Sequence, residues 1–317
     1  MGFPVAPASP LVVLNPHASR LHDPASRRAL TDALVRAVVA RTGMTPRVVD
    51  GPVEAAQQAF AAAASQKPSL VVVAGGDGSV RQAAAALAGS GIPLAIVPAG
   101  TGNVLARGLG IGGPAAAIRA LPSAREHRLD LGQVRWGEAD DPEHTGVEVF
   151  VVACGMGLDA RIMAGTDPGL KRRFSFGAYV AAALREVLRP QPSRFVVEAD
   201  GQRHELTGLS VLVANAGELI PGLLGPRQAI NPSDGRLDIL VLGGRGMVGA
   251  ARGGIELLLR MDGPHGGVAL RRTASHVRVE AMPAQPIQID GDVHGVGWLD
   301  ARILPGALTI LVPALAR

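Results

Sequence analysis

Residues 70–89 read LVVVAGGDGSVRQAAAALAG, an apolar run that ends in a glycine-rich turn and continues into an alanine-rich segment. Where a strand opens onto a helix, backbone N–H groups and the positive end of the helix dipole meet, which predicts an anion site. Gly75, Gly76 and Gly78 lack Cβ atoms and would let a phosphate group approach the main chain. Asp77 would repel that phosphate unless a divalent cation such as Mg²⁺ lay between them. The structural alternative is a tight turn whose aspartate caps the following helix.

Two further polar turns come directly after strand-like runs. Gly100, Thr101 and Asn103 follow the run in PLAIVPAGTGNV, and residues 15–19 follow the run in PLVVLNPHAS. Because the carboxyl ends of neighbouring parallel strands line one crevice, the three turns together predict a cradle for nucleotide phosphates. The GGDGSV turn has neither the Lys-Ser or Lys-Thr of a Walker A loop nor the G-x-G-x-x-G spacing of a dinucleotide fingerprint.

The first third of the chain alternates strand-like with helix-like segments. Apolar runs of strand length are expected to form strands at 10–16, 45–50, 69–76 and 93–100. Segments with apolar residues at helical spacing predict helices at 24–43, 53–66, 79–91, 103–111 and 114–123. This alternation predicts an α/β domain with a parallel, Rossmann-like sheet covered by helices on both faces.

The pattern changes near Arg125, where short strand-like runs punctuated by Gly, Pro and Asp begin to dominate. They lie at 125–136, 147–155, 193–200, 206–217, 236–244, 274–282, 286–292 and 307–315. Two segments at helical spacing interrupt them, at 175–190 and 246–263. The sequence therefore predicts a nucleotide-binding α/β domain over 1–127 and a mainly antiparallel β-sandwich domain over 128–303.

Composition narrows the function classes. The net charge is only +4 and aromatic residues make up 3% of the chain, which argues against nucleic acid as a partner. A single cysteine, Cys154, excludes an intrachain disulfide and suits a reducing compartment. No apolar run approaches the roughly 20 residues of a spanning helix, and the first residues lack a basic region typical of a signal peptide. We therefore expect a cytoplasmic protein.

An ordered set of motifs runs almost end to end through the chain. They are LNPHAS, VAGGDGSV, IVPAGTGNVLARGLGI, RLDLGQV, GMGLDA, NPSDGRLDIL, IQIDGD and LPGALTILVP. In this order they resemble the diacylglycerol kinase catalytic family, in the bacterial lipid kinase branch related to sphingosine and ceramide kinases. GGDG alone is weak evidence, since NAD kinases and phosphofructokinases share it. The resemblance implies ATP and Mg²⁺ in a cleft, with a C-terminal segment of about 304–317 returning to the first domain.

The resemblance and the three turns together assign roles to individual residues. The candidate nucleotide-binding residues are Asn15, Pro16, Ser19, Gly75, Gly76, Asp77, Gly78, Ser79, Gly100, Thr101 and Asn103. The resemblance implies that Asp77 also organises the catalytic Mg²⁺ and that Asp130 joins this network through water. It further implies that Asp234 holds a second, structural Mg²⁺ with main-chain oxygens of Asn231 and Arg236.

Three positions depart from the family pattern. The family's catalytic base is the glutamate of a DGE turn, whereas this chain has DGD and places Asp292 there. A carboxylate one methylene shorter could still accept a proton from a hydroxyl group within hydrogen-bond reach. Val104 stands where many members have aspartate, and the usual glycine cluster is altered to ELIPGLLGP at 218–226, part of the expected acceptor region.

These residues lead to one expected function and two alternatives. We expect an ATP-dependent kinase that transfers the γ-phosphoryl group to a hydroxyl group of a lipid, diacylglycerol or a relative, with Asp77 and Asp292 as catalytic residues. Such an enzyme of lipid metabolism would contact the inner face of the membrane peripherally. An NAD kinase-like or other small-molecule kinase is the first alternative. A catalytically silent lipid- or nucleotide-binding protein is the second, suggested by Val104 and Asp292. Whether the chain forms a homodimer stays open.

Overall fold

The computed structural model describes residues 8–141, 143–158, 160–161, 192–217, 230–243 and 268–314. Contacts divide the chain into two compact units. Unit 1 comprises Met1–Asp130 and Gly306–Arg317, and unit 2 comprises Leu131–Pro305. The boundaries predicted from the sequence fall nearby, after residues 127 and 303.

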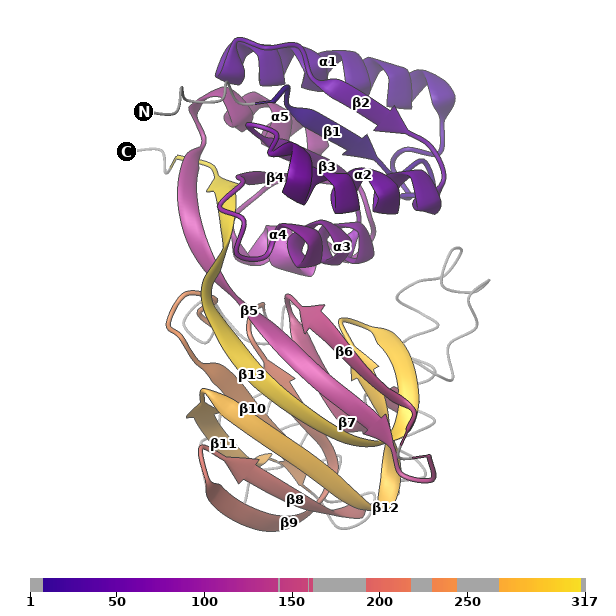
Figure 1. Ribbon diagram of the computed structural model, residues 1–317, viewed down its shortest axis with the longest axis vertical. Coiled ribbons are helices and arrows are strands. Elements are labelled where there is room, and N and C mark those ends of the chain that lie inside the picture. Colours follow the sequence, from indigo (N-terminus) through magenta and orange to yellow (C-terminus); the bar gives the residue numbers. More distant parts are fainter. Residues whose placement is uncertain are drawn as a thin grey trace. The chain divides into compact units, whose positions relative to one another are not determined.

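Unit 1 alternates strands with helices (Figure 1). Its elements are β1 (Leu11–Leu14), α1 (Pro24–Thr42), β2 (Arg47–Asp50), α2 (Val53–Gln66), β3 (Val71–Gly75), α3 (Asp77–Leu87), β4 (Leu94–Pro98), α4 (Val104–Gly108), α5 (Pro114–Ala120) and a short 3₁₀ helix (Leu121–Ser123). The beginning of β5 (Arg125–Glu138) and the end of β13 (Asp292–Val312) also belong to unit 1.

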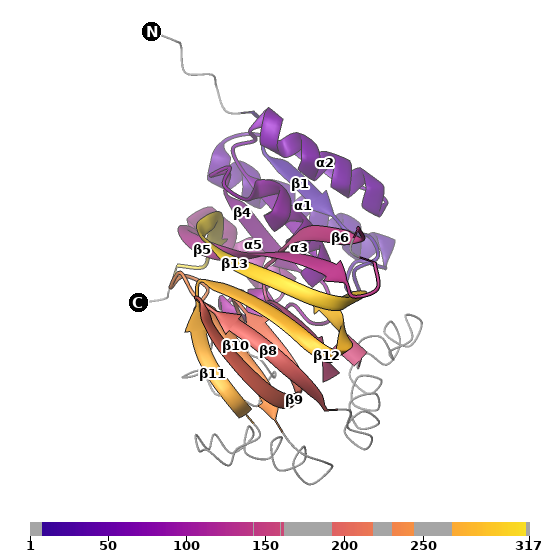
Figure 2. The same ribbon diagram turned by 60° about the horizontal axis from the view of Figure 1, so that its bottom comes forward.

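The strands of unit 1 pair in parallel. β1 lies between β2 and β3, β4 pairs with β3, and the end of β13 pairs with β4 through Ile310 and Leu94. Helix α1 packs with α5 and α2 packs with α3, and Figures 1 and 2 show helices around the strands. The chain steps from β1 outward to β2 and then back across β1 to β3. The carboxyl ends of β1 and β3 therefore mark a reversal of strand order, where open α/β sheets form a crevice.

Burial explains why these segments form this sheet. Every residue of β1, β3 and β4 is buried. Strands that are covered by helices on both faces have continuous apolar runs of this kind. β2 is mostly exposed and stands at the end of the described strand order. Helix α1 begins after Asp23, whose carboxylate accepts a hydrogen bond from the N–H of Ser26 at 2.8 Å. It ends at Gly43, whose φ of 71° gives the left-handed cap expected at this glycine.

Unit 2 is rich in β-strands. Besides most of β5 and β13, it contains β6 (Thr145–Phe150), β7 (Ala153–Gly157), β8 (Ser193–Ala199), β9 (Gln202–Ala214), β10 (Leu237–Gly243), β11 (Val268–Ala274) and β12 (His276–Ile289). The strand pairs β5–β6, β7–β9, β7–β12, β8–β9, β8–β12, β9–β10, β10–β11 and β12–β13 are all antiparallel. The helices expected at 175–190 and 246–263 and the loop at 218–226 lie outside the described residues.

The core of unit 2 is built from alternate residues of these strands. Phe150, Phe195 and Ile287 have no exposed surface and belong to one buried cluster. Along β8 the burial pattern alternates almost strictly, so one face of the strand meets the core and the other meets solvent. Cys154 is fully buried in the same cluster, as a small apolar side chain would be.

The chain passes between the units twice, in β5 after Asp130 and in β13 before Gly306. Asp130 is only 4% exposed, and its carboxylate accepts a hydrogen bond from the N–H of Gly306 at 2.7 Å. The guanidinium of Arg128 donates to the carbonyl oxygen of Gly306 at 3.0 Å. Gly306 has a φ of 56°, which favours glycine there. The two passages are thus joined to each other within unit 1.

Candidate active site

The three predicted turns follow the carboxyl ends of β1, β3 and β4. Asn15 follows β1, Gly76 follows β3, and Gly100 lies two residues after β4. β1 and β3 are direct neighbours, as are β3 and β4, so the turns share one edge of the unit 1 sheet. This edge includes the reversal of strand order, where ligands bind in open α/β sheets.

The first turn is fixed to the second by side-chain contacts. The amide nitrogen of Asn15 donates to the hydroxyl oxygen of Ser79 at 3.0 Å, and its amide oxygen accepts from the N–H of His17 at 2.9 Å. A Cβ on Gly75 would lie 2.6 Å from the same Ser79 oxygen, so the contact requires glycine. The hydroxyl group of Ser19 donates to the carbonyl oxygen of Ala99 at 3.3 Å, which joins the first turn to the third.

The second and third turns are in close contact through their main chains. The N–H of Ala99 donates to the carbonyl oxygen of Gly75 at 2.8 Å. A Cβ on Gly100 would lie 2.5 Å from the Cα of Gly76, too close for any side chain. Asn103, at a φ of 49°, folds its side chain back on the turn: its amide oxygen accepts from the N–H of Gly100 and its amide nitrogen donates to the Gly100 carbonyl oxygen.

Asp77 lies partly buried at the start of α3, but its carboxylate does not cap that helix. Oδ1 accepts a hydrogen bond from the N–H of Val104, the first residue of α4, at 2.7 Å. A Cβ on Gly102 would lie 2.6 Å from Oδ2. Burial raises the pKa of Asp77, while the N–H groups of Val104 and Asn103 and the positive charge of Arg107 oppose the rise. Asp77 therefore holds the second and third turns together through its carboxylate.

The arrangement fits a phosphate group. The first turn of α3 presents N–H groups that have no intrahelical acceptor, and Gly78 in that turn is exposed. A Cβ added to Gly78 would meet no atom within 4 Å, so the space beside this main chain is open. Thr101 is exposed on the third turn, and Pro16 lies partly buried in the first. Asp77 supplies the carboxylate that could hold Mg²⁺ beside such a phosphate.

The other predicted metal ligands are divided between the units, with Asp130 in unit 1 and Asp234 in unit 2. Asp130 contacts Gly306, as described above. Asp234 is exposed in a turn before β10, where its carboxylate accepts from the N–H of Arg236 at 3.0 Å and Asn231 accepts from the N–H of Ser233 at 3.2 Å. Among the residues that the structure describes, no three His, Cys, Asp or Glu side chains are grouped to hold a metal ion. The two magnesium sites stay predictions.

Asp292 is exposed at the first position of β13. It follows a two-residue turn, Asp290 and Gly291, that connects β12 to β13, and it pairs with Ile289 across the hairpin. Asp292 belongs to unit 2, whereas Asp77 and Thr101 belong to unit 1. A cleft that would hold ATP and Mg²⁺ and bring these three residues together therefore stays a prediction.

Two family models match the chain, one for each part. Residues 9–134 match the diacylglycerol kinase catalytic domain. Residues 152–312, half of the chain, match the YegS C-terminal NAD kinase beta sandwich-like domain. The chain belongs to the bacterial lipid kinase branch of the diacylglycerol kinase catalytic family. The resemblance drawn from the ordered motifs is thereby confirmed.

Individual relatives of this lipid kinase family member are distant. The "Putative lipid kinase SERP0390" of Staphylococcus epidermidis is 21% identical over half of this chain and 51% of its own length. The chain spans about half or less of the length of the curated relatives that it matches. A solved "putative diacylglycerol kinase" of Bacillus anthracis has a TM-score of 0.73 at 21% identity and covers 96% of this chain and 95% of its own. Yeast NADH kinase has a TM-score of 0.52 at 12% identity, covering 98% and 84%.

Two functional groups of this family member could not be identified from the sequence pattern: the main-chain N–H of Val104 and the carboxylate of Asp290. The main-chain N–H of Val104 contacts Asp77, whereas the sequence pattern marked only the side chain of Val104, as a lost carboxylate. The sequence pattern pointed to Asp292 and not to Asp290, yet the Asp290 carboxylate accepts three backbone N–H groups. An Asp-Gly pair between two strands is a strong hairpin signal and could have identified the turn, but not its partners.

Proposed function

We propose that this protein transfers the γ-phosphoryl group of ATP to a hydroxyl group of a lipid, with diacylglycerol or a related lipid as the acceptor. The observation that carries the proposal is the contact of three glycine- or asparagine-containing turns at the strand reversal of unit 1, with Asp77 tying two of them together. Membership of the lipid kinase family supports the reaction class.

In this proposal unit 1 binds the nucleotide. The N–H groups at the start of α3 would bind phosphate oxygens, and the exposed Gly78 and Thr101 would leave the main chain accessible to them. Asp77 would hold Mg²⁺, which would neutralise phosphate charge as the phosphoryl group moves. The contacts of Asn15 and Asn103 would keep the turns in place before the nucleotide arrives, so that little order is lost on binding.

Asp292 is the proposed general base. Its carboxylate would accept the proton of the lipid hydroxyl group as the oxygen forms a bond to the γ-phosphorus. The bond between that phosphorus and the bridging oxygen then breaks, and ADP leaves with the electron pair. This role requires the lipid hydroxyl group to come within about 3 Å of an Asp292 oxygen. Positioning and charge neutralisation supply most of the catalysis in such transfers.

The acceptor is proposed to come from a membrane surface. No helix within the described ranges is long and apolar enough to cross a membrane. In this proposal the enzyme contacts the bilayer peripherally to bind its lipid.

The direct test is incubation of the protein with γ-labelled ATP, Mg²⁺ and a total lipid extract, with NAD as a parallel acceptor. We expect label in the organic phase, in a lipid identified by mass spectrometry, and none in NADP. Label in NADP alone would support the NAD kinase-like alternative. Absence of transfer to every acceptor, with ATP still bound, would support the silent binding protein.

Asp292 variants test the proposed base. Asp292→Ala removes the proton acceptor and is expected to lower kcat by about 10²- to 10⁴-fold, the usual contribution of a general base. Asp292→Glu restores the family's residue and is expected to keep measurable transfer. The assignment of the base is wrong if Asp292→Ala turns over at the wild-type rate while circular dichroism shows both proteins folded.

A further inference from the structure

In unit 2, residues 151–153 follow β6 and end at the first residue of β7. One side chain accepts hydrogen bonds from all three of their N–H groups. The carboxylate of Asp290 accepts from Val151 through Oδ2 at 2.8 Å, and from Val152 and Ala153 through Oδ1 at 2.9 Å and 3.0 Å. The N–H of Asp290 in turn donates to the carbonyl oxygen of Ala153 at 2.8 Å. Hydrogen bonds to an ionised acceptor are roughly twice as strong as neutral ones.

The two remaining carbonyl oxygens of the same segment accept hydrogen bonds from Asn215 and Ala216, which follow β9. Asn215, which is fully buried, donates from its side chain to the carbonyl oxygen of Val151 at 2.9 Å. The N–H groups of Asn215 and Ala216 both donate to the carbonyl oxygen of Val152. The three N–H groups and three carbonyl groups of residues 151–153 therefore all have partners within the protein. Three stretches far apart in sequence, FVVACG, VANAG and IDGD, meet in this network.

The turn that carries Asp290 is also tightly constrained. Asp290 and Gly291 have φ angles of 46° and 88°, the left-handed pair expected of a two-residue hairpin turn that follows the twist of its strands. The N–H of Gly291 donates to the side-chain oxygen of Gln288 at 3.0 Å, and Gln288 is only 3% exposed. The next residue is Asp292, so the network fixes the point from which Asp292 leaves the turn.

We propose that Asp290 is a positioning residue for Asp292. Because its carboxylate binds the N–H groups of residues 151–153, it holds the turn where the Asp292 carboxylate can reach the acceptor hydroxyl group. The proposal rests on the function proposed above. A catalytic base displaced by about 1 Å can lose about 10²-fold in rate, so a rigid turn has a direct catalytic consequence.

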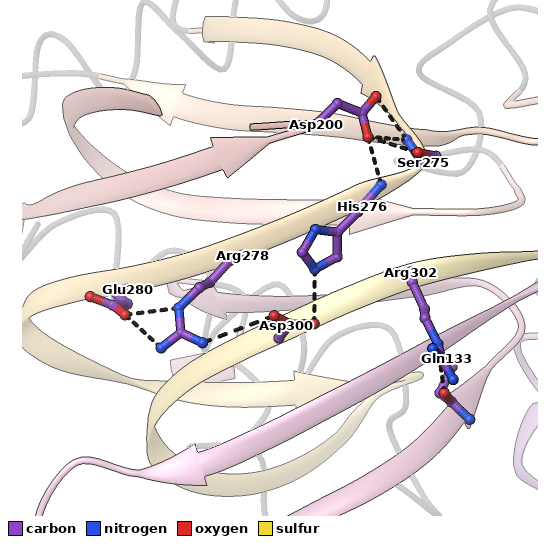
Figure 3. A network of polar contacts seen from close by, with 8 residues as sticks. All are labelled: Gln133, Asp200, Ser275, His276, Arg278, Glu280, Asp300 and Arg302. Atoms are coloured by element: carbon purple, nitrogen blue, oxygen red, sulfur yellow. Dashed lines mark hydrogen bonds and ion pairs between the residues drawn. The ribbon is translucent and has the colours of Figure 1, made fainter. Parts of the chain in front are cut away.

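A second Asp-Gly turn in unit 2 provides a matched control. Asp200 and Gly201 connect β8 to β9 with φ angles of 47° and 78°. Figure 3 shows the Asp200 carboxylate directed at Ser275 and His276. It accepts a hydrogen bond of 3.0 Å from the N–H group of each. Asp200 thus has the same backbone conformation and the same kind of partners, but no proposed catalytic residue follows it.

The experiment compares Asp290→Asn with Asp200→Asn. Asparagine tolerates the left-handed conformation, but its NH₂ group cannot accept a hydrogen bond from an N–H group. We expect Asp290→Asn to lower kcat for lipid phosphorylation by about 10- to 100-fold while the KM for ATP changes less than about twofold. Asp200→Asn is expected to keep kcat within about twofold of wild type. Equal kcat values for the two variants, measured where both are fully folded, would overturn the proposal.

Hydrogen exchange separates this proposal from the proposed function. Asp290→Asn is expected to accelerate amide exchange at residues 151–153, and Asp200→Asn to leave those amides unchanged, whether or not any lipid is phosphorylated. Unchanged exchange in Asp290→Asn would show that the Asp290 carboxylate does not restrain residues 151–153, and would overturn the proposal. If Asp290→Asn does not fold, Asn215→Ala releases the same segment from its other side and is expected to lower kcat in the same direction. A kcat within about twofold of wild type in that variant would count against positioning by this network.

Discussion

At the scale of single residues, Asp77 is an acidic side chain held partly away from water at the candidate site. Burial raises its pKa, and the hydrogen bonds from the turn around Val104 only offset part of that rise. A carboxyl group whose pKa is higher in the folded chain binds protons more readily there than in the unfolded chain. Its contribution to stability is fully present below the unfolded pKa and is lost as pH rises through the folded pKa.

We therefore expect Asp77→Asn to raise the melting temperature of the nucleotide-free protein at about pH 7. The amide oxygen can still accept from the N–H of Val104, and the cost of a buried charge is gone. The difference should shrink as pH falls toward about 4, near the ordinary aspartate pKa, because Asp77 itself becomes protonated. Thermal unfolding followed by circular dichroism checks this. A lower melting temperature for Asp77→Asn at about pH 7 would show that the charge stabilises the fold.

At the scale of elements, the strand–turn–helix units were predictable and their contacts were not. The apolar run before Gly75 and the alanine-rich segment after it indicated β3 and α3 directly. The partner of Asp77 was not predictable, since Val104 lies 27 residues further on and meets it only through packing of neighbouring turns.

The long strand β13 shows a second limit of sequence reasoning. The sequence suggested a strand at 307–315, after a stretch broken by glycine and proline, yet one strand runs over Asp292–Val312. Gly297 fits because a Cβ there would lie 2.0 Å from the carbonyl oxygen of Gly137 on β5. A glycine that reads locally as a break is thus required by the neighbouring strand.

The close approach of the second and third turns gives a prediction for the elements. Gly100→Ala would place a Cβ 2.5 Å from the Cα of Gly76, a main-chain atom that cannot rotate away, and should destabilise the protein by about 1–3 kcal/mol. The control is Gly78→Ala, which meets no atom within 4 Å and should stabilise α3 by about 0.5–1 kcal/mol. Urea unfolding measures both. Similar free energies of unfolding for the two variants would contradict the contact.

At the scale of the whole molecule, the two chain passages between units meet at Asp130 and Gly306. The resemblance suggested Asp130 as a member of a magnesium network, and the hydrogen bond to Gly306 gives it a structural role in unit 1. Both motifs were visible in the sequence, as RLDLG and LPGAL, but their pairing across 176 positions was not. Such pairing depends on the return of β13 to β4, which no local pattern specifies.

We expect Asp130→Ala to cost about 1–3 kcal/mol of stability, because the partly buried N–H of Gly306 loses its acceptor. Asp130→Asn keeps an accepting oxygen and should cost clearly less. Comparing the two by urea unfolding, and their activity at several Mg²⁺ concentrations, separates a structural role from a metal role. Equal losses of stability in both variants would show that the hydrogen bond to Gly306 contributes little.

Binding of ATP and Mg²⁺ at the turns of unit 1 is the claim on which the proposed reaction depends. Hydrogen–deuterium exchange with saturating ATP and Mg²⁺ measures it directly. The account predicts slower exchange in peptides covering residues 76–80 and 100–105, with the effect weakened when Mg²⁺ is chelated or Asp77 is replaced by asparagine. Protection confined to other parts of the chain, or none at ATP concentrations that saturate binding, would contradict it.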